Sequence, residues 1–94
     1  MNLCEILAIN LKYYRKKYHL SQEKFAEILG TTLSYLNQIE NIKVDVKAST
    51  IDKFAHKINK YDKKSRIKPE DLVKFRKNHI TNYSRIDERK KVNI

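Results

Sequence analysis

Several residue types are nearly absent from this 94-residue chain, and each absence excludes a class of site. The chain has one cysteine, one glycine, one proline and no tryptophan. Because Cys4 has no second cysteine to pair with, no intramolecular disulfide is possible, which is typical of a reducing cytoplasm. A single glycine also excludes a glycine-rich phosphate-binding loop.

Long apolar runs and metal-binding patterns are missing as well. No stretch approaches the ~20 apolar residues that a membrane-spanning helix needs, and the first residues lack the basic start and apolar run of a signal peptide. His19, His56 and His79 do not have metal-ligand spacing with one another or with Cys4. We therefore expect no enzyme, no metal, no cofactor and no membrane contact, and a cytoplasmic location.

Positive charge is what the chain has in excess. It contains 21 Lys and Arg residues against 11 Asp and Glu, for a net charge of +10 and a sequence pI near 9.8. Nine basic and six acidic residues up to Asn59 leave +3, whereas twelve and five from Lys60 onward leave +7. Such a charge favours a polyanionic partner, and the length corresponds to one small domain with a thin core.

The stretch from Ser21 to Glu40 contains two helix starts and one helix stop. Ser21 is a good N-cap because its hydroxyl can accept a hydrogen bond from a backbone N–H of the first turn. Gly30 stands where a helix would end in a left-handed residue, and Thr31 or Thr32 can cap a second helix directly afterwards. Two short helices joined by such a turn form a helix-turn-helix, although an ordinary helical hairpin has the same outline.

Two features favour the helix-turn-helix over the hairpin. Ala26 is small where two steeply crossed helices need close backbone approach, and the second helix buries Leu36 and Ile39. The outward side chains of that helix are uncharged until Glu40; they are Leu33, Ser34, Asn37 and Gln38. Because Asn and Gln can bond bidentately to an adenine edge, we interpret the helix around residues 32–40 as a DNA-reading helix.

Apolar residues at helical spacing predict one helix before this motif and one after it. The first is expected from Asn2 to Tyr18, with His19 in the left-handed region at its end. Its basic residues Lys16 and Lys17 form a solvated face or approach a phosphate. The later helix is expected from Ser49 to Tyr61, with Ser49 as cap and Asp52 completing an imperfect capping box. Its core-facing residues would be Ile51, Phe54, Ala55, Ile58 and Tyr61.

The remaining segments carry turn and linker signals. Asn41 to Lys47 is expected to be a loop, in which Asn41 takes the left-handed conformation and residues 44–46 form, at most, a short extended piece. A basic linker from Lys60 to Lys68 leads to Pro69, which suits the first turn of a fifth helix. The residues expected to pack back from that helix are Leu72, Val73 and Phe75.

A set of residues in and around the motif has the spacing of a known family. These residues are Arg15, Leu20-Ser21-Gln22-Glu23, Phe25-Ala26, Leu29-Gly30, Ser34-Tyr35-Leu36, Gln38-Ile39-Glu40 and Lys43. The combination resembles the Cro and lambda-repressor-like family, also called the Xre family, from about Leu7 to Val73. The family usually has Gly where this chain has Ile42 and Pro where it has Val46. The resemblance implies an all-α fold: a compact five-helix lambda-repressor-like DNA-binding domain over residues 1–77, and a C-terminal extension, helix or arm, over residues 78–94.

The resemblance also implies roles for individual residues. Positions that contact bases in the family are matched by Leu33, Ser34 and Gln38, with Asn37 as a plausible additional reader. Positions that contact the DNA backbone are matched by Gln22, Lys43 and Lys47, and for Tyr35 core packing and phosphate contact are both open. Arg15 and Glu40 match positions that form a buried ion pair.

The function implied by the resemblance is sequence-specific binding of double-stranded DNA by a transcriptional regulator, with repression as the expected sign. We expect a homodimer joined through the fifth helix and the segment after it, where the spare apolar residues are Phe75, Ile80, Tyr83, Ile86, Val92 and Ile94. An alternative is a protein-interaction module of the antitoxin type, whose main partner is a toxin protein. A third reading is non-specific binding of nucleic acid or acidic lipid through the basic end.

Overall fold

The computed structural model describes residues 1–80, and the regular structure within them is helical. The elements are α1 (Leu3–Lys17), α2 (Gln22–Leu29), α3 (Leu33–Glu40), α4 (Ala48–Tyr61) and the 3-10 helix η1 (Pro69–Val73). The expected all-α, five-helix fold is therefore confirmed, with a 3-10 helix as its fifth member. Residues 77–80 again have a helical backbone, and the rest of the predicted C-terminal extension lies outside the described residues.

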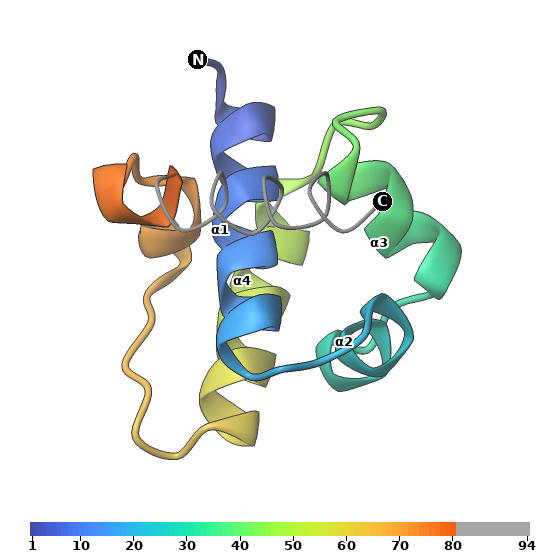
Figure 1. Cartoon of the computed structure of the whole chain (residues 1–94), viewed down its shortest axis with the longest axis vertical. Helices are drawn as coiled ribbons and strands as arrows, with labels where there is room; N and C mark the ends of the chain where they lie inside the picture. Colours follow the sequence, from blue (N-terminus) through green and yellow to red (C-terminus); the bar gives the residue numbers. More distant parts are fainter. Residues whose placement is uncertain (81–94) are drawn as a thin grey trace, which may run out of the picture.

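The helices surround one apolar core. In Figure 1, α1 stands in the middle with α4 behind it, α2 and α3 lie on one side, and η1 with its preceding linker lies on the other. The largest fully buried apolar side chains come from all five elements; they are Leu7, Leu11, Phe25, Leu29, Leu36, Ile39, Phe54, Ile58 and Leu72. Each contributes ~1.5–3 kcal/mol by leaving water. The arrangement leaves α3 at the edge of the domain, on the side away from the basic linker.

Local interactions fix both ends of α1. The side chain of Asn2 accepts a hydrogen bond from the Glu5 N–H (2.9 Å), and the Glu5 carboxylate accepts one from the Asn2 N–H (3.4 Å). This reciprocal capping box satisfies two N–H groups of the first turn. The helix ends at Tyr18, and His19 has a φ of 55°. The predicted limits Asn2 and Tyr18 are thus the two caps, and the left-handed His19 is confirmed.

Two predictions for the region between α3 and α4 are wrong. Asn41 has a φ of −98°, and the left-handed residue is Ile42, with a φ of 60°. The reason is that the Asn41 amide donates to the Asn37 backbone oxygen (2.8 Å) and so continues the last turn of α3. The N-cap of α4 is Lys47 rather than Ser49, and no side chain caps this helix. Ser49 lies inside the first turn, so the predicted capping box with Asp52 does not form.

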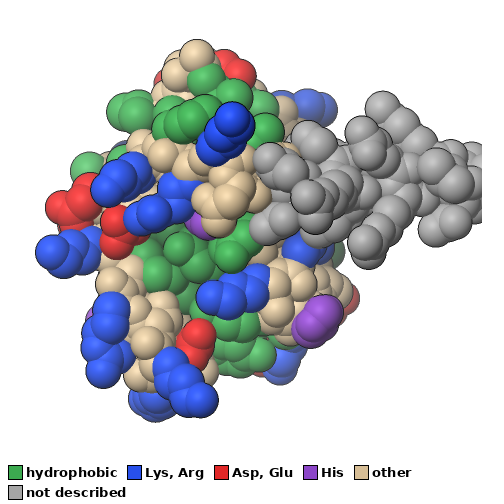
Figure 2. Space-filling view, turned by 60° about the vertical axis from the view of Figure 1, so that its left-hand side comes forward, with side chains coloured by type: hydrophobic (Ala, Val, Ile, Leu, Met, Phe, Trp, Pro, Cys, Tyr) green, Lys and Arg blue, Asp and Glu red, His purple; other side chains and the backbone are tan. Residues whose placement is uncertain are grey.

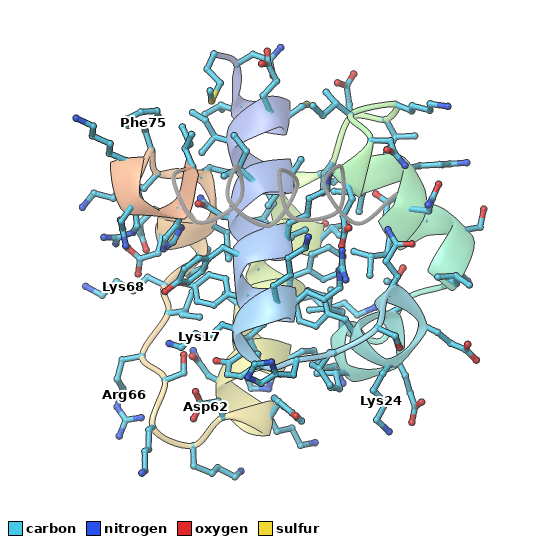
Figure 3. The ribbon with its side chains drawn as sticks, in the orientation of Figure 1. Lys17, Lys24, Asp62, Arg66, Lys68 and Phe75 are labelled. Atoms are coloured by element: carbon cyan, nitrogen blue, oxygen red, sulfur yellow. The ribbon has the colours of Figure 1, made fainter. Side chains whose placement is uncertain are left out.

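Two aromatic side chains predicted to pack on the core are exposed. Tyr61 is 47% exposed because Tyr18 packs between it and the core, with the two rings edge to face at 5.4 Å. Phe75 is 56% exposed and lies at the outer edge of the molecule in Figure 3. The other predicted packing residues, Ile51 and Val73, do contact the core. In the described part of the chain no strand forms at residues 44–46.

A buried polar contact holds the segment after η1 against α1. Asn10 is 1% exposed, and its amide donates to the backbone oxygens of Leu72 (2.8 Å) and Lys74 (3.0 Å). Its side-chain oxygen lies 2.8 Å from Nδ1 of His79. Since an amide oxygen only accepts, the imidazole carries a proton on Nδ1 and donates it. The docked segment therefore extends as far as His79.

The imidazole of His79 is an interior group. It is 4% exposed and stacks on the Tyr13 ring, with centroids 3.6 Å apart and an interplanar angle of 13°. Burial, followed by the charges of Arg76 and Lys17, lowers the pKa of His79 to about 4. The ring is therefore neutral at neutral pH.

Two kinds of site find no support in residues 1–80. None of their helices combines the length and apolar character needed to cross a membrane. No group of three or more His, Cys, Asp or Glu side chains among them could hold a metal ion.

Candidate nucleic-acid interface

The connection between α2 and α3 is a tight turn with caps on both sides. The Ser21 hydroxyl accepts from the Lys24 N–H (3.1 Å) at the start of α2. Gly30 ends that helix with φ 73° and ψ 35°, and the Thr32 hydroxyl accepts from the Tyr35 N–H (3.0 Å) at the start of α3. The two predicted helix starts and the left-handed glycine are confirmed, and Thr32 rather than Thr31 is the second cap.

A lysine from α4 braces this turn. The Lys53 Nζ donates to the Gly30 backbone oxygen at 2.6 Å. A Cβ placed on Gly30 would also meet the Lys53 Cε at 3.1 Å, so the lysine lies directly against the turn. Its position in the sequence does not indicate this role, because exposed lysines on helices usually face only solvent.

The outward face of α3 is uncharged and accessible. Leu36 and Ile39 are buried on its inner face, 0% and 2% exposed. The predicted reading residues Leu33, Ser34, Asn37 and Gln38 are all exposed. Leu33, at 46%, is an apolar side chain in contact with solvent. The face therefore presents one apolar group, one hydroxyl and two amides, which are the groups that can contact base edges.

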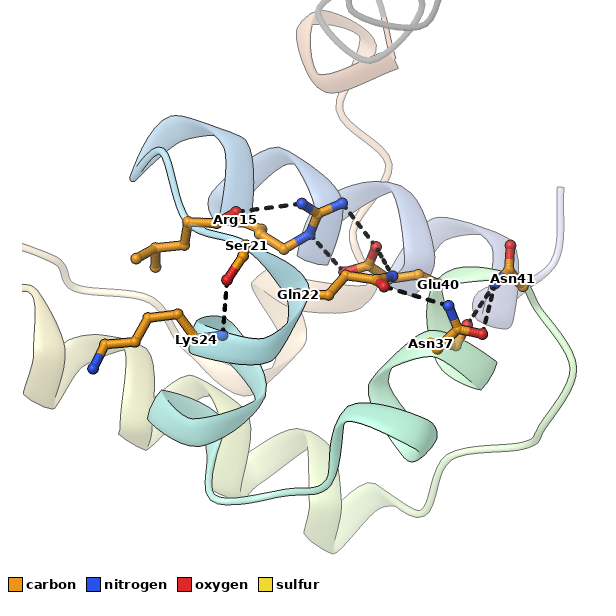
Figure 4. Close-up of polar contacts among 8 residues, drawn as sticks. Arg15, Ser21, Gln22, Lys24, Asn37, Glu40 and Asn41 are labelled. Atoms are coloured by element: carbon orange, nitrogen blue, oxygen red, sulfur yellow. Dashed lines mark hydrogen bonds and ion pairs between the residues drawn. The ribbon is translucent and has the colours of Figure 1, made fainter.

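The predicted partners Arg15 and Glu40 form a two-pronged ion pair between α1 and the end of α3. Arg15 donates from Nε to Glu40 Oε2 and from Nη2 to Glu40 Oε1, both at 3.0 Å (Figure 4). The Glu40 side chain is 1% exposed and that of Arg15 14%. Arg15 also donates to the Leu20 backbone oxygen (3.3 Å). The pair therefore fixes the C-terminal end of α3 against α1.

A chain of amides extends from this ion pair to the outer face of α3. Gln22 donates to Glu40 Oε1 (3.0 Å) and accepts from the Asn37 amide (3.3 Å), as Figure 4 shows. The Asn37 side-chain oxygen in turn accepts from Asn41 (3.2 Å). The Asn37 amide thus uses one of its two N–H groups and one of its two oxygen lone pairs on neighbouring side chains, and one of each remains. Gln38, the other side-chain amide of α3, makes no side-chain hydrogen bond to residues 1–80, so its whole amide edge is open.

A polar cavity of about 350 Å³ lies where α1, α2 and α3 meet. Its floor is the Arg15–Glu40 pair, and its walls include Lys12, Lys16 and Gln22. Lys16 therefore lies on the same side of α1 as α3, which is the position that its predicted approach to a phosphate requires. Lys17 lines a different cavity, formed by α1 and the linker after α4, so it does not share that position.

The other predicted backbone contacts are Tyr35, in the first turn of α3, and Lys43 and Lys47, in the loop that follows α3. Lys43 and Lys47 are exposed. Tyr35 is half-buried and packs against the core cluster, which fits the packing alternative and leaves part of the residue accessible. The cavity, through Lys12 and Lys16, and the exposed Lys43 therefore bring basic side chains close to the C-terminal end of α3.

Comparison with known proteins agrees with this geometry. A family model described as helix-turn-helix matches residues 11–62, more than half of the chain. The control protein C.SmaI of Serratia marcescens is 39% identical over 59 residues, which cover 63% of this chain and 70% of that protein. The crystal structure of a hypothetical transcription factor, NHTF from Neisseria, has the same fold, with a TM-score of 0.69 at 21% identity over 85% of this chain and 84% of that one.

The matched region contains both helices of the motif, the turn with Gly30 and the ion pair of Arg15 with Glu40. The chain therefore belongs to the helix-turn-helix family of DNA-binding transcription regulators, in its Xre or lambda-repressor-like branch, and not to a class of enzymes.

Proposed function

We propose that this protein binds double-stranded DNA sequence-specifically by laying α3 in the major groove, and that it acts as a repressor. The exposed, uncharged outer face of α3 is the observation that carries the proposal. A major groove admits one α-helix, whose N-terminal residues then contact base edges. The names of the two similar proteins, a control protein and a transcription factor, support a regulatory role. The site of action would be the nucleoid in the cytoplasm.

Three side chains on α3 are proposed to contact bases. Gln38 offers both its amide oxygen and its amide N–H groups to an adenine edge. Ser34 offers a hydroxyl, and Leu33 has no polar atom and therefore contacts a thymine methyl group. Asn37, whose amide is partly engaged by Gln22 and Asn41, is an additional reader with one N–H and one oxygen lone pair left for a base.

Phosphate contacts are proposed on both sides of α3. Gln22, at the start of α2, keeps one amide N–H beyond its bond to Glu40. Lys43 and Lys47 follow α3, and Tyr35 offers its accessible edge. These groups orient the helix without reading sequence. The contacts of Lys43 and Lys47 are expected to weaken as salt concentration rises, because cations that neutralise phosphates release counterions.

Selection of bound duplexes from a random pool tests the proposal, because it shows whether a preferred site exists. Gln38→Ala is then expected to weaken binding to that site by about 1–3 kcal/mol and to leave binding to random duplex nearly unchanged. Binding of Ser34→Ala to the selected site is compared with that of Ser49→Ala, which serves as its control. Both serines are exposed in the first turn of a helix, but only Ser34 lies on α3. Equal losses on selected and random DNA would refute base reading by Gln38.

A homodimer is proposed as the DNA-binding form, because one recognition helix covers few base pairs. Two copies on half-sites one helical turn apart, about 34–36 Å, would double the contacts. Phe75, with 56% of its surface exposed, supports an interface beyond η1; the other spare apolar residues except Ile80 lie outside the described part of the chain. Phe75→Ser is expected to shift sedimentation toward the monomer, and an unchanged dimer would place the interface elsewhere.

Co-purification of a neighbour-encoded protein on this surface would favour the antitoxin alternative.

A further inference from the structure

A second cavity lies across α1 from the recognition helix. It has a volume of about 530 Å³ and lies between the end of α1, the linker after α4 and the segment after η1. In Figure 3, Lys17, Asp62 and Arg66 lie around this region, on the side of α1 away from α3. Figure 2, which turns this side forward, shows hydrophobic side chains (green) in the middle of the face with Lys and Arg side chains (blue) around them.

Positive charge predominates in this cavity. Four cations line it, namely Lys17, Lys64, Arg66 and Arg76, against two carboxylates, Asp62 and Asp71. Only Arg76 has a carboxylate at ion-pair distance within residues 1–80, since its Nη2 lies 3.3 Å from Asp71 Oδ1. The other three cations, one from α1 and two from the linker, have no carboxylate at that distance in residues 1–80, and Lys17 Nζ lies 5.9 Å from the centroid of the Tyr18 ring.

Both carboxylates already have hydrogen-bond donors. Asp62 Oδ2 accepts from the Tyr18 hydroxyl (2.8 Å) and Oδ1 accepts from the Lys64 N–H (3.1 Å). Asp71 Oδ2 accepts from the Lys68 N–H (2.9 Å), in addition to the contact of Oδ1 with Arg76. The Arg66 guanidinium uses Nη1 for the Lys63 and Ser65 backbone oxygens, both at 2.9 Å. Its Nε and Nη2 make no hydrogen bond to residues 1–80, so they remain available to a ligand.

The electrostatic effect of these cations is visible on neighbouring groups. The hydrogen bond from Tyr18, the Lys64 N–H and then the charges of Lys17 and Lys64 lower the pKa of Asp62 below its ordinary value. After burial, the charges of Arg76 and Lys17 lower the pKa of His79. An anion placed among these cations would relieve their mutual repulsion.

The wall of the cavity is suited to an apolar group. Tyr14 and Ile67 line it, the former 9% exposed and the latter packed against the core. A volume of about 530 Å³ lies within the range of small-molecule sites and exceeds what one inorganic ion occupies. The cavity therefore combines several cations, which suit a doubly charged phosphate, with room for an organic part.

We propose that this cavity binds a small organic phosphate, with its phosphate group among Lys17, Lys64 and Arg66 and its organic part against Tyr14 and Ile67. Such a ligand would be an effector bound on the opposite side of α1 from the DNA. The two sites share no proposed contact residue. An experiment can therefore find DNA binding without phosphate binding, or phosphate binding without DNA binding.

Calorimetric titration of the full chain at low salt tests the proposal, with adenosine 5′-monophosphate, inorganic phosphate and adenosine as probes. The nucleotide is expected to bind, inorganic phosphate to bind more weakly, and adenosine not to bind detectably. The double variant Lys17→Gln/Arg66→Gln is expected to weaken nucleotide binding roughly tenfold, since charge-assisted contacts at an accessible site are lost.

A matched control makes the same change in net charge elsewhere. Lys24 and Lys60 are exposed and do not line the cavity, so Lys24→Gln/Lys60→Gln is expected to leave nucleotide binding unchanged. No nucleotide binding by the parent chain, or equal weakening in both double variants, would overturn the assignment. If Lys17→Gln/Arg66→Gln weakened binding of random duplex DNA as much as nucleotide binding, the cavity would belong to a DNA-backbone surface, which also overturns it.

Discussion

Replacing Arg15 with alanine is expected to be among the most destabilising single changes in this domain. The substitution removes both hydrogen bonds from Arg15 to Glu40, whose side chain is 1% exposed, and leaves that carboxylate with a neutral donor, the Gln22 amide, in place of a cation. Breaking a buried ion pair from one side costs about 3–5 kcal/mol, because the other charge is left uncompensated. For a chain of this size the whole free energy of unfolding is roughly 5–14 kcal/mol, so the loss is a large share of it.

Urea unfolding followed by circular dichroism measures this loss directly. Lys24→Ala is the matched control, because it breaks the ion pair with Glu27 (3.5 Å), in which both side chains are exposed. Exposed pairs are worth at most about 1 kcal/mol, so Lys24→Ala is expected to leave the urea midpoint almost unchanged. A melting experiment should show the same contrast, with a decrease of at least roughly 12 °C for Arg15→Ala.

A double variant separates the cost of the stranded charge from the cost of lost packing. Arg15→Met/Glu40→Leu removes both charges, and such replacements of buried pairs are often neutral or stabilising. We therefore expect it to recover most of the stability lost in Arg15→Ala. If Arg15→Ala and Lys24→Ala had equally small effects, or if the double variant were no more stable than Arg15→Ala, the reasoning from a stranded buried charge would be refuted.

Three further predictions concern stability. Ile42→Gly is expected to raise the free energy of unfolding by about 1 kcal/mol, because a β-branched residue is strained at a φ of 60°, and a lower urea midpoint would contradict this. Asn10→Ala is expected to cost about 1–3 kcal/mol in urea unfolding, since its buried partners, including the Leu72 oxygen and the His79 N–H, lose their hydrogen bonds. Because the pKa of His79 is about 4 when folded and near 6.5 when unfolded, the unfolded chain binds more protons as the pH falls. Stability should therefore decrease between pH 6.5 and 4, and His79→Gln should flatten that decrease; an equal decrease in the variant would exclude His79 as its cause.

Features set by neighbouring residues were predictable from the sequence. Ser21, Gly30 and His19 each act within one turn of the backbone, through a cap or a left-handed conformation that their residue type favours. The exposure of α3 followed from helical spacing, because Leu36 and Ile39 define its buried side. The family resemblance added the pairing of Arg15 with Glu40, which spacing alone does not indicate.

Features that depend on distant partners were not predictable. The brace from Lys53 to Gly30 spans 23 positions, and the amide contact between Gln22 and Asn37 spans 15. Neither lysine nor glutamine has a residue-type preference that selects such a partner. The N-cap of α4 was placed two residues late, at Ser49 instead of Lys47, because serine is a favourable cap by type, yet no side chain caps this helix. The exposure of Phe75 likewise depends on where the docked segment after η1 runs.

The hydrogen bond between Asn10 and His79 joins groups 69 positions apart, so a growing chain contains Asn10 well before it contains His79. The ribosome makes α1 first, so the Asn10 amide has to remain hydrated while the other helices appear. Its protein partners, the Leu72 and Lys74 oxygens and the His79 ring, all emerge after α4 is finished. Contacts between distant residues form slowly because the loop between them must close first. A nascent chain that already contains the whole helix-turn-helix therefore still lacks the partners of the Asn10 amide on α1. The contacts of the domain are complete only after the segment that reaches His79 has left the ribosome.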